Sequence, residues 1–232
     1  MPEPPFAPFT SQHGMTVMIG AAAMAVFVIL GRRGGQCERI TRTVLAFLNL
    51  TAVGFGSWAW SHVQRETDID NVVPLHLCDL AAILAGFALI TRNRTLAMLT
   101  YFWGLAGTVQ GVATPAIDIG WPHPAFLSFF IHHFAVITAA FYLPLVLGWR
   151  IEIPWWKSPL KAFGWLNLYV VVAVAVNAML DTNFGFLARK PINPSLLDHL
   201  GPHPMYIFWL ELIAMLLFLL LALPVRDRKT AL

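Results

Sequence analysis

Seven long apolar stretches, separated by short breaks, constrain this chain more than any other feature of its sequence. A helix of about 20 apolar residues is long enough to cross the hydrocarbon core of a bilayer. The stretches run approximately over Met15–Leu30, Val44–Val63, Val72–Thr91, Leu96–Thr114, Ala125–Gly148, Leu160–Leu180 and Met205–Leu223. We therefore expect an all-α, multi-pass protein of the cell membrane, a bundle of seven transmembrane helices.

The composition excludes an ordinary soluble domain. Of the 232 residues, 58% are hydrophobic and only 12% are charged, whereas soluble domains carry about 25% charged residues. The breaks are short and rich in Gly, Pro, Asn and Asp, so residues 1–232 are expected to form a single transmembrane domain. The net charge of +3 is explained by basic loops that face anionic lipid, and we expect no nucleic-acid partner.

The orientation of the helices follows from the distribution of Lys and Arg between alternate loops. Of the 15 such residues, 12 fall on one side of the membrane and 3 on the other. Loops rich in Lys and Arg stay in the cytoplasm, so we expect the N-terminus outside and the C-terminus inside. The three residues on the outer side are Arg65, Arg189 and Lys190.

The third helix carries a polar arc formed by His76, Cys78 and Asp79. At about 100° per residue these side chains fall within about 160° of one another, together with the small residues Ala82 and Gly86. Polar groups are costly in hydrocarbon, so we expect this arc to face the bundle and the opposite side to face lipid. The opposite side consists of Leu77, Leu80, Leu84 and Phe87.

The fifth helix repeats this pattern. His132 and His133 share a side with Ser128, Ala139 and Ala140. The periodicity turns both histidines inward and does not choose between them. The opposite side consists of Phe130, Phe134 and Phe141.

Depth brings further polar residues to the same level. Cys78 and the two histidines are each expected about 10 Å below the outer boundary, at 1.5 Å per residue. Near that level we expect side chains of the fourth, sixth and seventh helices, which makes five contributing helices. These additional candidates, to which we assign substrate binding with His76, are Gln110, Asn177, Asp181 and Glu211. The convergence predicts a functional site that opens to the outer leaflet, although one such residue alone is often only packing or interhelical glue.

Four segments of the sequence carry a resemblance to a known family. They are Pro74–Leu80 (PLHLCDL), Tyr101–Gln110 (YFWGLAGTVQ), Phe129–His133 (FFIHH) and Lys190–Tyr206 (KPINPSLLDHLGPHPMY). They resemble the YwaF-like family of bacterial integral membrane proteins, which is similar to an animal transmembrane acyltransferase of ether phospholipid remodelling. The resemblance covers nearly the whole chain beyond Val44.

The resemblance implies a lipid-metabolic role with a covalent nucleophile. In the animal relative the cysteine of the first block carries the acyl group, which maps onto Cys78. The family histidine of the fifth helix falls on His133. The chain departs from the family pattern at Asn183-Phe184, where Asn-Tyr is usual, and at His203, where tryptophan is common.

Acyl transfer needs a nucleophile, a base and donors for the oxyanion. The catalytic candidates are Cys78 as nucleophile, His133 or His132 as base, and Asp79 as the residue that orients the base, with Asp181 as an alternative for that role. Gln110 or Asn177 would supply the donors. We expect a phospholipid or lysophospholipid partner and no cofactor.

Two alternatives remain open at this stage. A seven-helix zinc hydrolase would use Cys78, Asp79 and the histidines as ligands, although no helix offers a His-x-x-x-His pair. A non-enzymatic transporter, receptor or lipid-binding protein would use the polar cavity without chemistry, because a fold does not fix a function. Neither inverted repeats nor interrupted helices, which mark many transporters, are evident in the sequence.

The orientation can be tested at Cys37, which lies in a basic loop. Because 12 of the 15 Lys and Arg residues share its side, we expect Cys37 to react with maleimide only after the inner membrane face is made accessible. Labelling of Cys37 in intact cells by an impermeant reagent would reverse the predicted topology.

Overall fold

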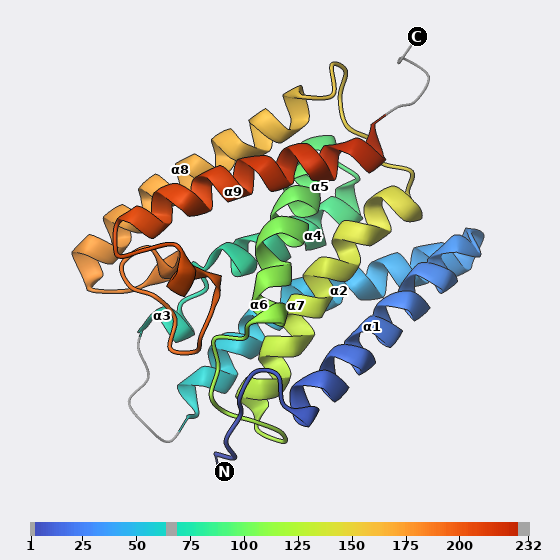
Figure 1. The fold of residues 1–232 in the computed structure, drawn as a ribbon. Helices are drawn as coiled ribbons and strands as arrows, with labels where there is room; N and C mark the ends of the chain where they lie inside the picture. The colour runs from blue at the N-terminus through green and yellow to red at the C-terminus, as the bar shows by residue number, and fades with distance from the viewer. Residues whose placement is uncertain (1–2, 64–68, 227–232) are drawn as a thin grey trace.

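In the part of the chain that the structure describes, seven helical segments are long and apolar enough to cross a membrane. Figure 1 shows how they are arranged. The structure, a computed structural model, describes residues 3–63 and 69–226. The segments are α1 (Ser11–Arg32), α2 (Gly35–Ser61), α3 with α4 (Ile69–Val72 and Leu77–Thr91), α5 with η1 and α6 (Arg94–Trp103, Gly104–Thr108 and Val109–Ala113), α7 (Pro124–Leu145), α8 (Lys157–Leu180) and α9 (Met205–Ala222). Each coincides with one predicted stretch, which confirms the all-α, seven-helix prediction. The direction of the helices across the membrane stays a prediction.

Helix α2 begins at Gly35, well before the predicted Val44. Its first turns are held by charged side chains rather than by apolar ones. Arg42 donates to Glu38 over 2.8 Å within α2, and to the carbonyl oxygen of Leu89 at the end of α4 over 2.8 Å. The helix therefore extends past the apolar stretch into the end of the bundle that carries most of the basic residues.

Helix α4 lies at the centre of the bundle, packed against α2, α5 and α7. Helices α8 and α9 pack on each other and lie side by side on one flank (orange and red in Figure 1), while α1 and α2 lie on the opposite flank. Small residues permit the close contact at the centre. A Cβ atom added at Gly86 of α4 would lie 2.5 Å from the Leu50 side chain of α2.

We predicted that the leucine side of α4 faces lipid, and for most of this side the prediction is wrong. Leu77, Leu80 and Leu84 pack against a core cluster formed with α5, α8 and α9, because the α8–α9 pair covers that side. The outward-facing position is Phe87, whose side chain is 48% exposed. On α7, Phe130 is likewise buried, because Phe6 of the N-terminal segment packs against it.

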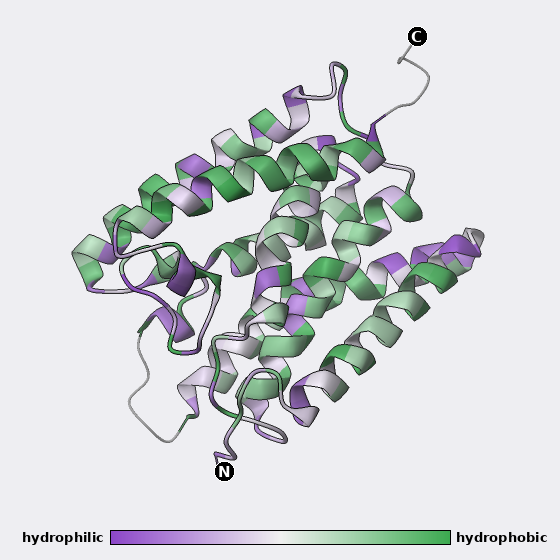
Figure 2. Cartoon of the chain, in the orientation of Figure 1, coloured by the Kyte–Doolittle hydropathy of each residue, from purple (hydrophilic) through white to green (hydrophobic). Residues whose placement is uncertain are grey.

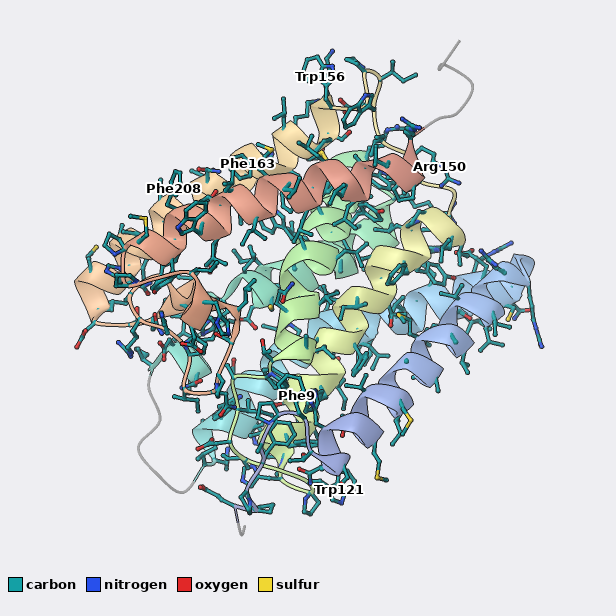
Figure 3. All side chains as sticks on the ribbon, viewed as in Figure 1. Phe9, Trp121, Arg150, Trp156, Phe163 and Phe208 are labelled. Atoms are coloured by element: carbon teal, nitrogen blue, oxygen red, sulfur yellow. The ribbon has the colours of Figure 1, made fainter. Side chains whose placement is uncertain are left out.

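The two ends of the bundle are marked by polar and aromatic residues. Figure 2 shows apolar residues along the long helices and polar residues gathered at helix ends and in the segment before α9. Trp121 lies at the end near the N-terminus, and Trp156 lies at the opposite end near Arg150 (Figure 3). Both tryptophans are exposed, as expected for rings at the two membrane–water boundaries.

The N-terminal segment closes the end of the bundle near Trp121. The Phe6 N–H donates to the carbonyl oxygen of Asp118 over 2.7 Å, in the loop between α6 and α7. The buried His13 places Nε2 2.9 Å from the carbonyl oxygen of Val112 in α6. These contacts tie the start of the chain to the loop that borders the cavity described next.

Candidate active site

A cavity of about 680 Å³ lies between the α8–α9 pair and the rest of the bundle. Its walls come from α2, α4, α6, α7, α8 and α9, and the segment between α8 and α9 also contributes to them. The polar lining includes Asp70, His76, Cys78, Asp79, Gln110, His132, His133, Tyr169, Lys190 and Glu211. Seven of the nine residues predicted for the site thus share one cavity, which reaches the molecular surface at the exposed Gln110.

Cys78 lies at the N-terminus of α4. The sequence had predicted it deeper inside one continuous helix. Proline has no N–H and disfavours a helical conformation of the preceding residue, so Pro74 ends the helical turn of α3. The chain becomes helical again only at Leu77, with His76 as the extended N-cap residue. Cys78 is therefore the second residue of α4.

The break leaves a hydrogen-bond donor beside the thiol. Within the described residues, the Cys78 N–H has no hydrogen-bond acceptor, whereas the Leu77 N–H interacts with the hydroxyl oxygen of Tyr169. A Cα–Cβ bond in a helix tilts toward the N-terminus, so the Cys78 side chain leans toward the same end as this free donor. The first turn of α4 thus offers a nucleophile next to a group that stabilises negative charge.

Asp79 ties this first turn together. Its Oδ2 accepts from the N–H of His76 over 3.0 Å, as a residue at the third helical position does in a capping box. Its Oδ1 lies 3.6 Å from Nδ1 of His132 in α7. The carboxylate therefore links the N-terminus of α4 to the histidine pair.

The two histidines of α7 are both buried and have different partners. His132 places Nε2 3.0 Å from the carbonyl oxygen of Cys78. This bond requires a proton on Nε2, so Nε2 is unavailable to accept a proton. The other ring nitrogen of His132, Nδ1, faces the Asp79 carboxylate. This contact is attractive only when a proton lies between Nδ1 and the carboxylate oxygen. His132 therefore fixes the position of Cys78 relative to α7.

His133 keeps one nitrogen free. Its Nδ1 lies 2.7 Å from the carbonyl oxygen of Phe129, one turn earlier in α7, and so carries the proton in the neutral ring. Its Nε2 carries the lone pair and lies against Gly111 of α6, where an added Cβ atom would be 2.6 Å away. Among the described residues, neither ring makes a regular hydrogen bond to the Cys78 thiol. Such contacts often tighten only with substrate.

A π-helical turn at Gly104–Thr108 shapes the wall opposite Cys78. Such turns are rare and frequently occur at functional sites. Thr108 belongs to this turn, and its hydroxyl interacts with the Cys78 thiol. The geometry is too loose for a regular hydrogen bond, and the buried Oγ1 has no other partner among the described residues. The sequence analysis missed Thr108, which stands out only as a polar residue between glycines.

Tyr169 of α8 is a second residue that the sequence analysis missed. Its hydroxyl donates to the carbonyl oxygen of Leu75 over 3.3 Å, within the break before α4. Nearby, Nδ1 of His76 accepts from the N–H of Gly185 over 3.3 Å. These bonds hold the break against α8 and the segment that follows it. A lone tyrosine in a valine-rich helix was the available signal.

The remaining substrate-binding predictions divide into two groups. Gln110 and Glu211 line the cavity, and Glu211 accepts from Asn167 of α8 over 3.2 Å. Asn177 and Asp181 do not line it. Asp181 is the exposed, left-handed C-cap residue of α8, so it lies at the end of that helix and outside the cavity.

Asn177 is buried, and its side chain makes three hydrogen bonds to the turn after α8. Its Oδ1 accepts from the Phe184 N–H over 2.8 Å and from the Thr182 hydroxyl over 2.9 Å. Its Nδ2 donates to the carbonyl oxygen of Phe184 over 3.0 Å. It holds the turn after α8 and does not line the cavity, so its remaining donor hydrogen is not placed to hold an oxyanion there.

Metal binding finds little support in this arrangement. Across residues 3–63 and 69–226, no group of three His, Cys, Asp or Glu side chains is placed to hold a metal ion. The described part of the chain therefore offers the zinc-hydrolase alternative no ligand set.

The comparison with known proteins gives a family. The sequence model of the TMEM164 family matches residues 8–222, and the chain therefore belongs to that family. Together with the seven apolar helices, this makes it a multi-pass integral membrane protein. The match supports a membrane-protein family and does not extend to the narrower YwaF-like assignment. No curated protein and no solved structure matches the chain.

The structural role of Asn177 can be separated from substrate binding. We expect Asn177→Ala to lower the free energy of unfolding by about 3 kcal/mol, because it leaves buried groups of Phe184 unpaired. Asn167→Ala on the same helix removes two hydrogen bonds of an exposed side chain and should cost less than about 1 kcal/mol. Denaturation of the purified proteins in mixed micelles measures both changes. Unaltered stability with a large loss of activity in Asn177→Ala would restore the substrate-binding interpretation.

Proposed function

We propose that this member of the TMEM164 family is a membrane-embedded lipid acyltransferase, or lipid hydrolase, that uses Cys78 as its nucleophile. The observation that carries the proposal is the position of Cys78 at the start of α4, in the wall of a cavity, with its own backbone N–H unpaired within the described residues. An unpaired donor is expensive in a membrane-embedded protein. One next to a thiol suits an oxyanion that forms only during acyl transfer.

The hydrogen bonds favour His133 as the base. The Nε2 of His133 carries a lone pair in the neutral ring, because Nδ1 donates to Phe129. In the first half-reaction, Nε2 takes the thiol proton while Sγ attacks the ester carbonyl carbon of a phospholipid. The tetrahedral oxyanion accepts from the Cys78 N–H, at the positive end of the α4 dipole. The departing lysophospholipid oxygen then receives the proton from His133, which leaves an acyl thioester on Cys78.

The second half-reaction reverses these proton movements. Nε2 of His133 removes a proton from the hydroxyl of an acceptor lysophospholipid, and the resulting oxygen attacks the thioester carbonyl. The C–S bond breaks, the thiolate leaves, and the proton returns to sulfur. Water in place of the lysophospholipid gives hydrolysis instead. No cofactor is required for either outcome.

The other lining residues take supporting roles. His132 and Asp79 hold the first turn of α4 in place through the Cys78 carbonyl oxygen and the His76 N–H. Gln110 and Glu211 supply polar contacts for the lipid headgroup or glycerol oxygens, at the surface and inside the cavity respectively. His76 is already bonded to Gly185 through Nδ1, so only Nε2 is available to a substrate.

The non-enzymatic alternative has its own supporting observation. The cavity alone is large enough for part of a lipid, and the resting thiol makes no regular hydrogen bond to either described histidine ring. A transporter or lipid-binding protein would need the cavity and not the nucleophile. Substitution of the thiol separates the two functions.

We expect Cys78→Ser to lower acyl transfer from phospholipid to lysophospholipid by at least about a hundredfold, because a hydroxyl is a far poorer nucleophile than a thiol. His133→Ala should lose a similar amount, and the double variant little more, because the two groups act as one unit. Lipid mass spectrometry of reconstituted protein gives the rates.

Cys37→Ser is the matched control, since Cys37 lies on α2 outside the cavity, and it should keep full activity. Circular dichroism and thermal melting would establish that each variant is folded. Turnover by folded Cys78→Ser at the level of the unsubstituted protein would favour the non-enzymatic function.

A further inference from the structure

A second cavity, of about 770 Å³, lies at the end of the bundle that carries Arg150 and Trp156 (Figure 3). It is bordered by the turn between α4 and α5 and by the segment after α7. Three arginines line it, Arg92, Arg94 and Arg150. It shares no lining residue with the cavity of the candidate active site, so the two cavities are separate.

Backbone oxygens orient two of the three guanidinium groups without neutralising them. Arg94 donates from Nη2 to the carbonyl oxygen of Arg150 over 3.2 Å. Arg150 donates from Nη1 to the carbonyl oxygens of Pro144 and Trp149, over 3.0 Å and 2.7 Å. A carbonyl oxygen carries no net charge, and each guanidinium has five donor hydrogens. Both groups therefore keep their charge and several free donors.

The nearby carboxylates are too few to balance this charge. Glu152 accepts from Lys161 over 2.7 Å, and this hydrogen bond holds the pKa of the Glu152 carboxyl below its usual value. Glu38 is shared between Arg42 at 2.8 Å and Arg92 at 3.6 Å. These described groups are five cations and two carboxylates, an excess of three positive charges. Of the seven groups, the three arginines and Glu152 line the cavity itself.

The rest of the lining is apolar. Leu143, Leu147 and Ile151 form part of the wall, and Ile153 at the rim is 61% exposed. The exposed Trp155 lies two residues further along the chain, as expected at the boundary between water and hydrocarbon. A soluble phosphate would leave these apolar groups uncovered, whereas a lipid would cover them with its acyl chains.

We propose that this cavity is a binding site for an anionic phospholipid, with its phosphate group on Arg92, Arg94 and Arg150 and its acyl chains against Leu147 and Ile153. Arginine suits this ligand because its planar fork of donors matches two phosphate oxygens. Basic pockets between transmembrane helices at the cytoplasmic side bind anionic headgroups in the same way. The predicted topology places this end in the cytoplasmic leaflet, where anionic lipids are concentrated.

Titration of the full chain in phosphatidylcholine nanodiscs with phosphatidylglycerol, read by native mass spectrometry of the released complexes, tests the proposal. We expect phosphatidylglycerol to be retained, and Arg94→Gln/Arg150→Gln to weaken its binding about thirtyfold, from two lost basic contacts. Arg39→Gln, an exposed arginine outside the cavity, should bind as the unsubstituted protein does.

A further variant is needed because Arg94 and Arg150 also donate hydrogen bonds to backbone oxygens, so their substitution could weaken lipid binding by disturbing the fold. Arg92 is 57% exposed and makes one long ion pair at 3.6 Å, so Arg92→Gln should fold and weaken binding about fivefold. Equal retention of phosphatidylcholine, or an equal loss in Arg39→Gln, would overturn the proposal. Displacement of the lipid by inorganic phosphate at matched concentration would assign the cavity to a soluble anion and also overturn it.

Discussion

The backbone of a membrane-embedded helix must satisfy its own hydrogen bonds, and the site of this protein depends on one place where that requirement is broken. Pro74 interrupts the third span, and α4 restarts at Leu77. In lipid, an unpaired N–H group such as that of Cys78 would cost several kcal/mol. It is tolerated here because it borders a cavity that water or a substrate can enter. The same break places Cys78, His76 and Asp79 within one turn, so the position of the thiol and the free donor beside it have a single cause.

Helix α7 completes the site because its two adjacent histidines, His132 and His133, have different hydrogen-bond partners and therefore different roles. His132 holds α4 through the carbonyl oxygen of Cys78, whereas His133 uses Nδ1 on its own helix and keeps Nε2 free. Gly111 and the π-helical turn of Gly104–Thr108 let α6 approach the His133 ring closely. Replacing a small residue at that contact would move the ring. Chemistry at Cys78 would thus depend on packing between helices as well as on the reacting groups.

Much of the fold and part of the site follow from the sequence alone. Hydropathy predicts the seven spans, and helical periodicity turns Cys78 and the histidine pair inward. Periodicity does not choose between His132 and His133, because the choice depends on which carbonyl oxygens each ring meets. Depth along a helix also fails for Asn177 and Asp181, whose side chains hold or cap the end of α8. Pro74 with His76-x-x-Asp79 was a readable break and capping signal, and it predicts a new helix start at Leu77, directly before Cys78.

The central claim is that Cys78 forms a covalent bond to an acyl group. The most direct measurement is the intact mass of the purified protein after incubation with a phospholipid of defined acyl chains. The account predicts an added mass of one acyl group, removed by neutral hydroxylamine as thioesters are, present in Cys37→Ser and absent in Cys78→Ala. An adduct that persists in Cys78→Ala, or no adduct in a Cys78-containing protein that turns over lipid, would contradict it.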